Sequence, residues 1–105
     1  MSTLTNKELK LDKLFKDTLG SNNVYFQPPE SVRMQYPCIV WNLAKIPVQY
    51  ADDKAYLKNP KYVIRYISTE PDDPMRLTLT EVLGVPMIQV YNKDGLYHYI
   101  YELYY

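Results

Sequence analysis

The residue types that most often carry out catalysis or bind metals are scarce in this sequence and stand apart from one another. His98 is the only histidine and Cys38 the only cysteine. A general base needs a partner that orients it, and a zinc site needs several His or Cys ligands at defined spacing. We therefore expect His98 to be a structural residue in a β-strand and Cys38 to be a small buried hydrophobe. No enzyme is predicted.

Two pairs of adjacent aspartates are the remaining candidates for chemistry. Asp52-Asp53 could contribute to a hard-cation site, but such a site needs further oxygen ligands at defined spacing, so no metal is predicted. Asp72-Asp73 precede Pro74 and suit a helix start, where a carboxylate accepts hydrogen bonds from backbone N–H groups. The three glycines all stand at expected turns. That leaves no glycine-rich phosphate loop, and no cofactor is predicted.

Composition limits the classes of partner. The 12 basic and 12 acidic residues cancel, so there is no long-range attraction to nucleic acid or to an anionic membrane. No segment reaches the ~18 apolar residues of a membrane span, and the first twenty residues do not resemble a signal peptide. A single cysteine suits a reducing compartment. We expect one soluble domain over residues 1–105, made inside the cell. One alternative is a basic and aromatic nucleic-acid face that gathers Lys58, Lys61 and Arg65 with Tyr56, Tyr62 and Tyr66.

Tyrosine is the unusual component, with 12 copies in 105 residues. Its ring is apolar but its hydroxyl needs a partner, so tyrosine suits β-strands, half-buried surfaces and interfaces. Two interpretations follow. The tyrosines form one wall of a β-rich core, or they contact other chains.

The elements that would position these residues begin with an amphipathic helix over residues 6–19. Thr5 and Glu8 fit a capping box, and Gly20 suits the left-handed residue that ends a helix. A turn at 69–74 leads into a second helix, which Gly84 can end. Strands are predicted over residues 24–26, 36–43, 62–68, 86–91 and 96–105, with a hairpin turn over residues 92–95. This order predicts an α+β fold, an antiparallel or mixed sheet of about four to five strands with two helices packed on one face.

Residues 45–61 show neither a helical nor a strand period, and we predict a long loop there. Loops of this length inside compact domains are usually functional. Its length and its tyrosine content together favour a contact with another chain over a merely solvated loop. The candidate contact residues are Tyr50, Asp52, Asp53, Lys54 and Tyr56.

Several sequence blocks resemble a known family. The blocks NVYFQPPES, MQYPCIVW, YADDKAY, KYVIRYI and PDDP occur in this order within residues 20–74. This half of the chain resembles a family of small proteins of tailed bacteriophages, which serve as tail terminators, tail-completion or head–tail joining proteins.

The resemblance implies a structural virion protein that forms a ring, commonly sixfold, at the head-proximal end of the tail tube. Such a ring ends tube polymerisation and joins the tail to the head connector. It needs no catalysis, cofactor, membrane or specific nucleic acid. Its partners would be further copies of itself, the tail tube protein, and head connector or adaptor proteins. Heterologous contacts repeated around an axis would build it.

Under this resemblance, residues 24–41 become an extended arm with a rigid proline corner, whose ordering cost on binding is low. Its aromatics could equally fill the core, Phe26 and Trp41 first. The candidate contact residues in this segment are Tyr25, Gln27, Pro28, Pro29 and Tyr36. The alternative function is a small monomeric cytoplasmic adaptor or inhibitor, which binds a host or phage protein through the same aromatic surface.

Overall fold

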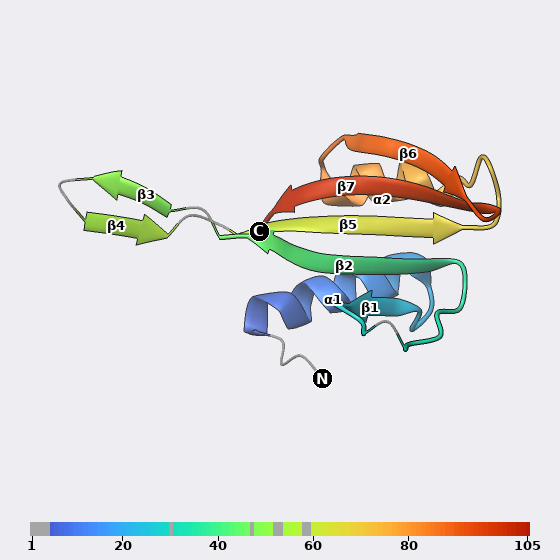
Figure 1. The fold of residues 1–105 in the computed structure, drawn as a ribbon, viewed down its shortest axis with the longest axis horizontal. Coiled ribbons are helices and arrows are strands. Elements are labelled where there is room, and N and C mark those ends of the chain that lie inside the picture. Colours follow the sequence, from blue (N-terminus) through green and yellow to red (C-terminus); the bar gives the residue numbers. More distant parts are fainter. Residues whose placement is uncertain (1–4, 30, 47, 52–53, 58–59) are drawn as a thin grey trace.

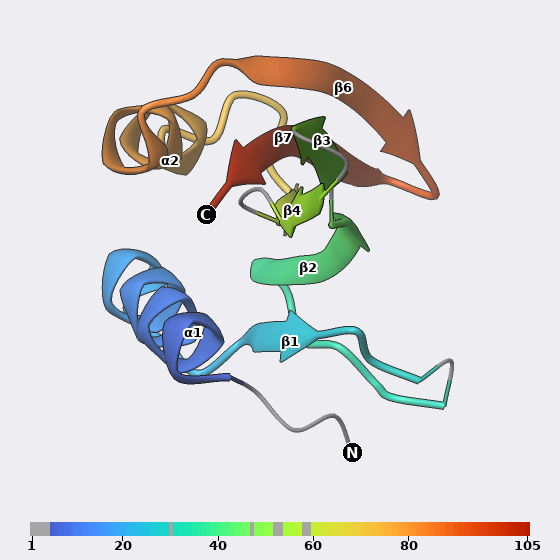
Figure 2. The ribbon, with the colours of Figure 1, turned by 90° about the vertical axis from the view of Figure 1, so that its left-hand side faces the viewer.

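The computed structural model has two helices and a five-stranded mixed sheet, and it describes residues 5–29, 31–46, 48–51, 54–57 and 60–105. The predicted α+β fold is confirmed, and Figures 1 and 2 show both helices on one face of the sheet. The strand order is β1-β2-β5-β7-β6. In chain order, these elements are α1 (Asn6–Leu19), β1 (Val24–Phe26), β2 (Cys38–Lys45), β5 (Lys61–Ser68), α2 (Met75–Leu83), β6 (Met87–Lys93) and β7 (Leu96–Tyr104).

Helix α1 begins and ends where the sequence predicts. The Thr5 hydroxyl accepts a hydrogen bond from the Glu8 N–H (3.2 Å), and the Glu8 carboxylate accepts one from the Thr5 N–H (3.0 Å). This is a complete capping box. At the other end, Gly20 takes φ 75°, a left-handed conformation that glycine adopts without a steric penalty. Leu11 and Phe15 are buried against the sheet.

The core lies between the helices and the sheet. Trp41 on β2 is fully buried, with its ring centroid 5.3 Å from Phe15, 4.4 Å from Phe26 and 5.6 Å from Tyr62. The expectation that Phe26 and Trp41 belong to the core is therefore confirmed. Alternate residues of β2, β5 and β7 supply the rest of this layer. The buried strand residues of the core cluster are Val24, Ile39, Trp41, Tyr62, Ile64, Tyr66, Tyr99 and Tyr101.

The hairpin β6–β7 turns at Asp94-Gly95, as predicted. Both residues have positive φ, 55° and 76°, which the favoured two-residue hairpin turn requires. Several strand boundaries differ from the prediction by one or two residues. The largest shift is in β2, which begins at Cys38 rather than at Tyr36 and continues to Lys45.

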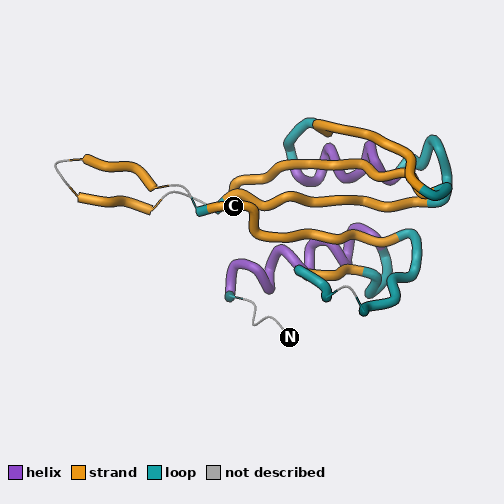
Figure 3. Tube along the Cα trace, viewed as in Figure 1, coloured by secondary structure: helices purple, strands orange, loops and turns teal. Residues whose placement is uncertain are grey.

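The prediction of a long loop over residues 45–61 is wrong. Strands β3 (Val48–Ala51) and β4 (Lys54–Leu57) form a separate two-stranded antiparallel sheet, here called the ribbon. Figure 3 shows the ribbon extending away from the main sheet, and the molecule measures 51 × 29 × 25 Å. Each strand has only four residues, too few for a period of two to stand out in the sequence.

The extended arm predicted over residues 24–41 is also corrected. Strand β1 pairs in parallel with β2, with Val24 opposite Ile39, so both ends of the segment belong to the main sheet. Parallel neighbours need a crossover connection. Of the described residues of this segment, 27–29 and 31–37 leave the sheet, here called the 27–37 loop, and Figure 2 shows them on the side opposite the helices.

Candidate interaction surfaces

Cys38 is fully buried at the start of β2. Burial raises the pKa of its thiol to about 12, because the charged thiolate is disfavoured away from water. The thiol is therefore protonated at neutral pH and is not a nucleophile in the folded protein. Among the residues that the structure describes, no three His, Cys, Asp and Glu side chains gather to hold a metal ion.

His98 lies on the face of the sheet that neither helix covers. Its ring stacks on Tyr91 of β6, with centroids 4.5 Å apart and planes 6° from parallel. Its Nδ1 atom is buried, with no hydrogen-bond partner among the described residues. Burial, and then the charges of Arg65 and Lys93, lower the pKa of His98. The imidazole is therefore neutral at pH 7.

Four buried tyrosines fill the layer between sheet and helices. Each donates its hydroxyl to an oxygen of α1 or of the segment around the start of α2. The four pairs are Tyr62 to Glu8 (3.0 Å), Tyr66 to Asp73 (2.6 Å), Tyr99 to the Pro71 carbonyl (2.6 Å) and Tyr101 to the Arg76 carbonyl (2.6 Å). For these four, the core interpretation of tyrosine is correct, since neither ring nor hydroxyl is free to contact another chain.

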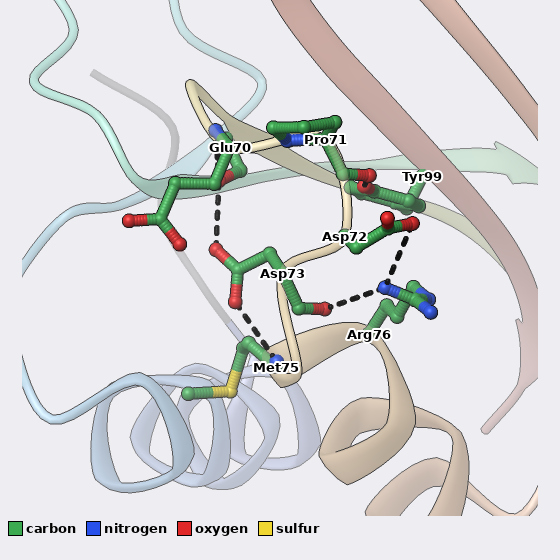
Figure 4. A network of polar contacts seen from close by, with 8 residues as sticks. Glu70, Pro71, Asp72, Asp73, Met75, Arg76 and Tyr99 are labelled. Carbon is green, nitrogen blue, oxygen red and sulfur yellow. Dashed lines mark hydrogen bonds and ion pairs between the residues drawn. The ribbon is translucent and has the colours of Figure 1, made fainter.

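Asp73 organises the entry to α2 (Figure 4). One carboxylate oxygen accepts hydrogen bonds from the hydroxyls of Tyr66 (2.6 Å) and Ser68 (2.7 Å). The other accepts one from the Met75 N–H (2.9 Å), which Figure 4 shows. Burial alone would raise the pKa of Asp73, but these three bonds and the Arg76 charge outweigh burial and lower it. Asp73 is therefore the residue of the aspartate pair whose side chain accepts a backbone N–H at the start of the helix.

The candidate contact residues of segment 24–41 divide into two groups. Tyr25 and Gln27 brace the 27–37 loop: the Tyr25 hydroxyl accepts a hydrogen bond from the Gln35 N–H (3.2 Å), and the Gln27 side-chain oxygen accepts one from the Leu43 N–H (3.1 Å). Pro28 is half-buried. Pro29 and Tyr36 are exposed, with Tyr36 at 38%. Gln27 is exposed as well but is held by its bond to Leu43, which leaves Pro29 and Tyr36 as the exposed candidates without such a bond.

The other candidates lie on or between the strands of the ribbon. Its register pairs Val48 with Leu57, Gln49 with Tyr56, Tyr50 with Ala55 and Ala51 with Lys54. Neighbouring ladder positions alternate between faces. Tyr50 therefore shares one face with Val48, Ala55 and Leu57, and Lys54 and Tyr56 belong to the other. Asp52 and Asp53 lie outside the described residues.

A groove of about 620 Å³ lies at the root of the ribbon. Its apolar walls come from β1, the end of β2 and the start of β5, and the first turn of α1 supplies its polar edge. Sequence reasoning missed it, because its walls come from four distant segments. The lining residues are Thr5, Asn6, Lys7, Glu8, Phe26, Gln27, Leu43, Ile46, Pro60 and Tyr62.

The basic and aromatic face expected of a nucleic-acid binder is not formed as predicted. Tyr62 and Tyr66 point into the core at 3% and 1% exposure, whereas Lys61 and Arg65 alternate with them and lie on the opposite face. Lys61 is also paired with Glu102 at 2.6 Å. Lys58 lies outside the described residues.

No helix in the described part of the chain is long and apolar enough to cross a membrane. No protein-family model matches the chain, and no curated protein matches its sequence. The indications of function are therefore the ribbon, the 27–37 loop and the sheet face that the helices leave open.

Proposed function

We propose that this protein is a structural subunit of a tailed-bacteriophage virion. It assembles into a ring at the head–tail junction, ends polymerisation of the tail tube and joins the tail to the head connector. The ribbon is the observation that carries this proposal. It extends beyond the body of the molecule (Figure 1), and its main contacts are between its own two strands.

A two-stranded ribbon by itself is at best marginally stable in water. A ribbon of this apolar and aromatic composition gains stability when another surface packs against it. Because the ribbon points away from its own body, that surface belongs to another molecule. The resemblance of the sequence blocks to the phage family favours a neighbouring subunit or the tail tube.

A closed ring needs contacts between two different surfaces of the same chain. A projecting ribbon supplies one such surface, and tyrosine is among the residue types that dominate interface energies. The groove at the ribbon root and the exposed residues of the 27–37 loop offer apolar and aromatic receiving surfaces. None of these contacts requires catalysis.

Light scattering after size exclusion, over a range of protein concentrations, tests the ring. We expect a discrete oligomer, and a shift towards monomer for Tyr50→Ser. Tyr56→Ser is the matched control, since it removes the same side chain from the opposite face of the ribbon and should have a smaller effect. A phage that lacks the protein should yield filled heads and separate tails of abnormal length.

If the protein is strictly monomeric in solution, the ring can form only on the tail tube. Purified virions must then contain the protein. Its absence from virions, or normal virions without it, would overturn the proposal. A monomer that is absent from virions but binds one host or phage protein would be the adaptor or inhibitor instead.

A further inference from the structure

Three basic side chains come together on the face of the main sheet opposite the helices. Arg65 on β5, His98 on β7 and Lys93 on β6 occupy this face by the strand registers, which pair Ile67 with His98 and Lys93 with Leu96. Arg65 and Lys93 are thus diagonal neighbours of His98, one on each flanking strand. Such neighbours are about 7–8 Å apart, within reach of long side chains.

This group of charges has no acidic partner within the described residues. None of the three ion pairs there involves Arg65, His98 or Lys93. Glu102 on the same face is already paired with Lys61 at 2.6 Å. In a chain with zero net charge, two cations beside the neutral His98, with no ion pair to a carboxylate among the described residues, form a local positive site.

Two properties of His98 also indicate a binding site on this face. Its pKa is lowered partly by the charges of Arg65 and Lys93, which places all three groups in one electrostatic environment. Its buried Nδ1 has no hydrogen-bond partner among the described residues, so no described group of the chain engages this atom of the ring. Asp94, in the turn beside Lys93, forms no ion pair with it.

The surroundings favour a protein over a nucleic acid. Ile67 and Ile100 lie on the same face at 4% and 8% exposure, so the basic side chains lie beside buried apolar residues. Tyr91 is already stacked on His98 and is not free to stack on a base. The positive site is confined to one place, whereas a protein that binds nucleic acid usually has basic residues along the path of the phosphate backbone.

We propose that this open sheet face docks an acidic segment of a protein partner, whose carboxylates accept hydrogen bonds from Arg65 and Lys93 above His98. The guanidinium of Arg65 can bind a carboxylate through two parallel hydrogen bonds. The site is separate from the ribbon, and it does not depend on the proposed ring.

A carboxylate held beside His98 stabilises the imidazolium form. Docking is therefore coupled to proton uptake, and the acidic segment binds more tightly as the pH falls. Because His98 is the only histidine, its imidazole NMR signals report on this site alone. The probe is a peptide of alternating Glu and Gly, and its control is the same peptide with Gln in place of Glu.

We expect the Glu peptide to raise the pKa of His98 by about 0.5 unit, so that affinity rises as the pH falls from 7.5, towards a limit of about threefold once His98 is protonated in the free protein as well. Arg65→Gln should abolish binding, and it should raise the pKa of His98 in the free protein because a like charge is removed. Arg33→Gln, on the exposed 27–37 loop, is the matched control and should change neither property. Arg65→Lys should restore part of the binding.

Three results would overturn the proposal. The first is equal binding of the Glu and Gln peptides, and the second is binding that survives Arg65→Gln. The third is a shift of the His98 signals by a short oligothymidylate but not by the Glu peptide, which would assign the face to nucleic acid. Tryptophan fluorescence of each variant verifies that the core around Trp41 is intact.

Discussion

Replacing Asp73 by alanine should destabilise the protein strongly, because one carboxylate serves three donors at the start of α2. The buried hydroxyls of Tyr66 and Ser68, which are 1% and 2% exposed, would lose their acceptor. A buried polar group without a partner costs about 1–3 kcal/mol, and loss of a helix cap costs about 1 kcal/mol. With two such hydroxyls and one cap, we therefore expect a loss of at least about 3 kcal/mol from the free energy of unfolding.

Urea denaturation followed by tryptophan fluorescence measures this loss directly. Trp41 is the only tryptophan and is fully buried, so its emission reports on the core. The midpoint should fall without a change in the slope of the free energy against urea concentration. The matched control is Asp72→Ala, whose carboxylate is 91% exposed and lies 3.8 Å from Arg76, and it should leave stability close to that of the wild type.

The pH dependence gives a second, independent measurement. In the folded state, the hydrogen bonds from Tyr66, Ser68 and Met75 hold the pKa of Asp73 below its ordinary value. A lowered folded-state pKa contributes stability that is present above the unfolded pKa of about 3.9 and is lost as the pH falls through the folded value. The stability difference between wild type and Asp73→Asn should therefore shrink as the pH falls below about 4.

Equal losses for Asp72→Ala and Asp73→Ala would refute the reasoning. So would a difference between wild type and Asp73→Asn that stays constant between neutral pH and the acid end of the folded range. Either outcome would mean that the hydroxyls of Tyr66 and Ser68 find water or other acceptors when the carboxylate is absent or protonated.

Three further predictions concern other parts of the fold. Cys38 should not react with a disulfide reagent at pH 8 in the native state, because burial raises its pKa to about 12. It should react once urea unfolds the chain. Equal rates of reaction in the two states would contradict this burial. Tyr62→Phe removes the hydrogen bond to Glu8 and should cost about 1.5 kcal/mol in urea denaturation, so an unchanged midpoint would contradict the contact. Gly95→Ala forces a side chain into a turn at φ 76° and should cost about 1 kcal/mol, whereas a stabilised variant would show that the turn is misassigned.

The elements that the sequence predicts well carry their signals locally. The capping box of Thr5 and Glu8 and the stop at Gly20 lie within or next to one helix, and the Asp94-Gly95 turn needs only two residues. The ribbon has no comparable signal. Its two strands are only four residues each, too short for a period of two to stand out. Period alone could not separate them from a loop.

The surfaces were harder to predict, because their residues meet only through strand register. Composition shows that tyrosine is abundant but not where its hydroxyls bond, since the acceptor for Tyr62 lies 54 residues away at Glu8. The alternation of residues along β5 does predict that Arg65 lies on the other face of the strand from Tyr62 and Tyr66. Its proximity to Lys93 and His98 appears only when β7 is placed between β5 and β6.

The two sides of the main sheet differ in what they leave for a partner. On the helix side, the hydroxyls of the four buried tyrosines all have acceptors within the chain. On the other side, His98 and the charges beside it have none among the described residues. The ribbon is a third surface, on a separate sheet from both. Because Tyr50 and Arg65 belong to different sheets and share no described contact, their effects on assembly and on binding of an acidic segment should be independent. Loss of one property without the other in each single variant would separate the two proposals, whereas joint loss in either variant would show that both surfaces serve a single interface.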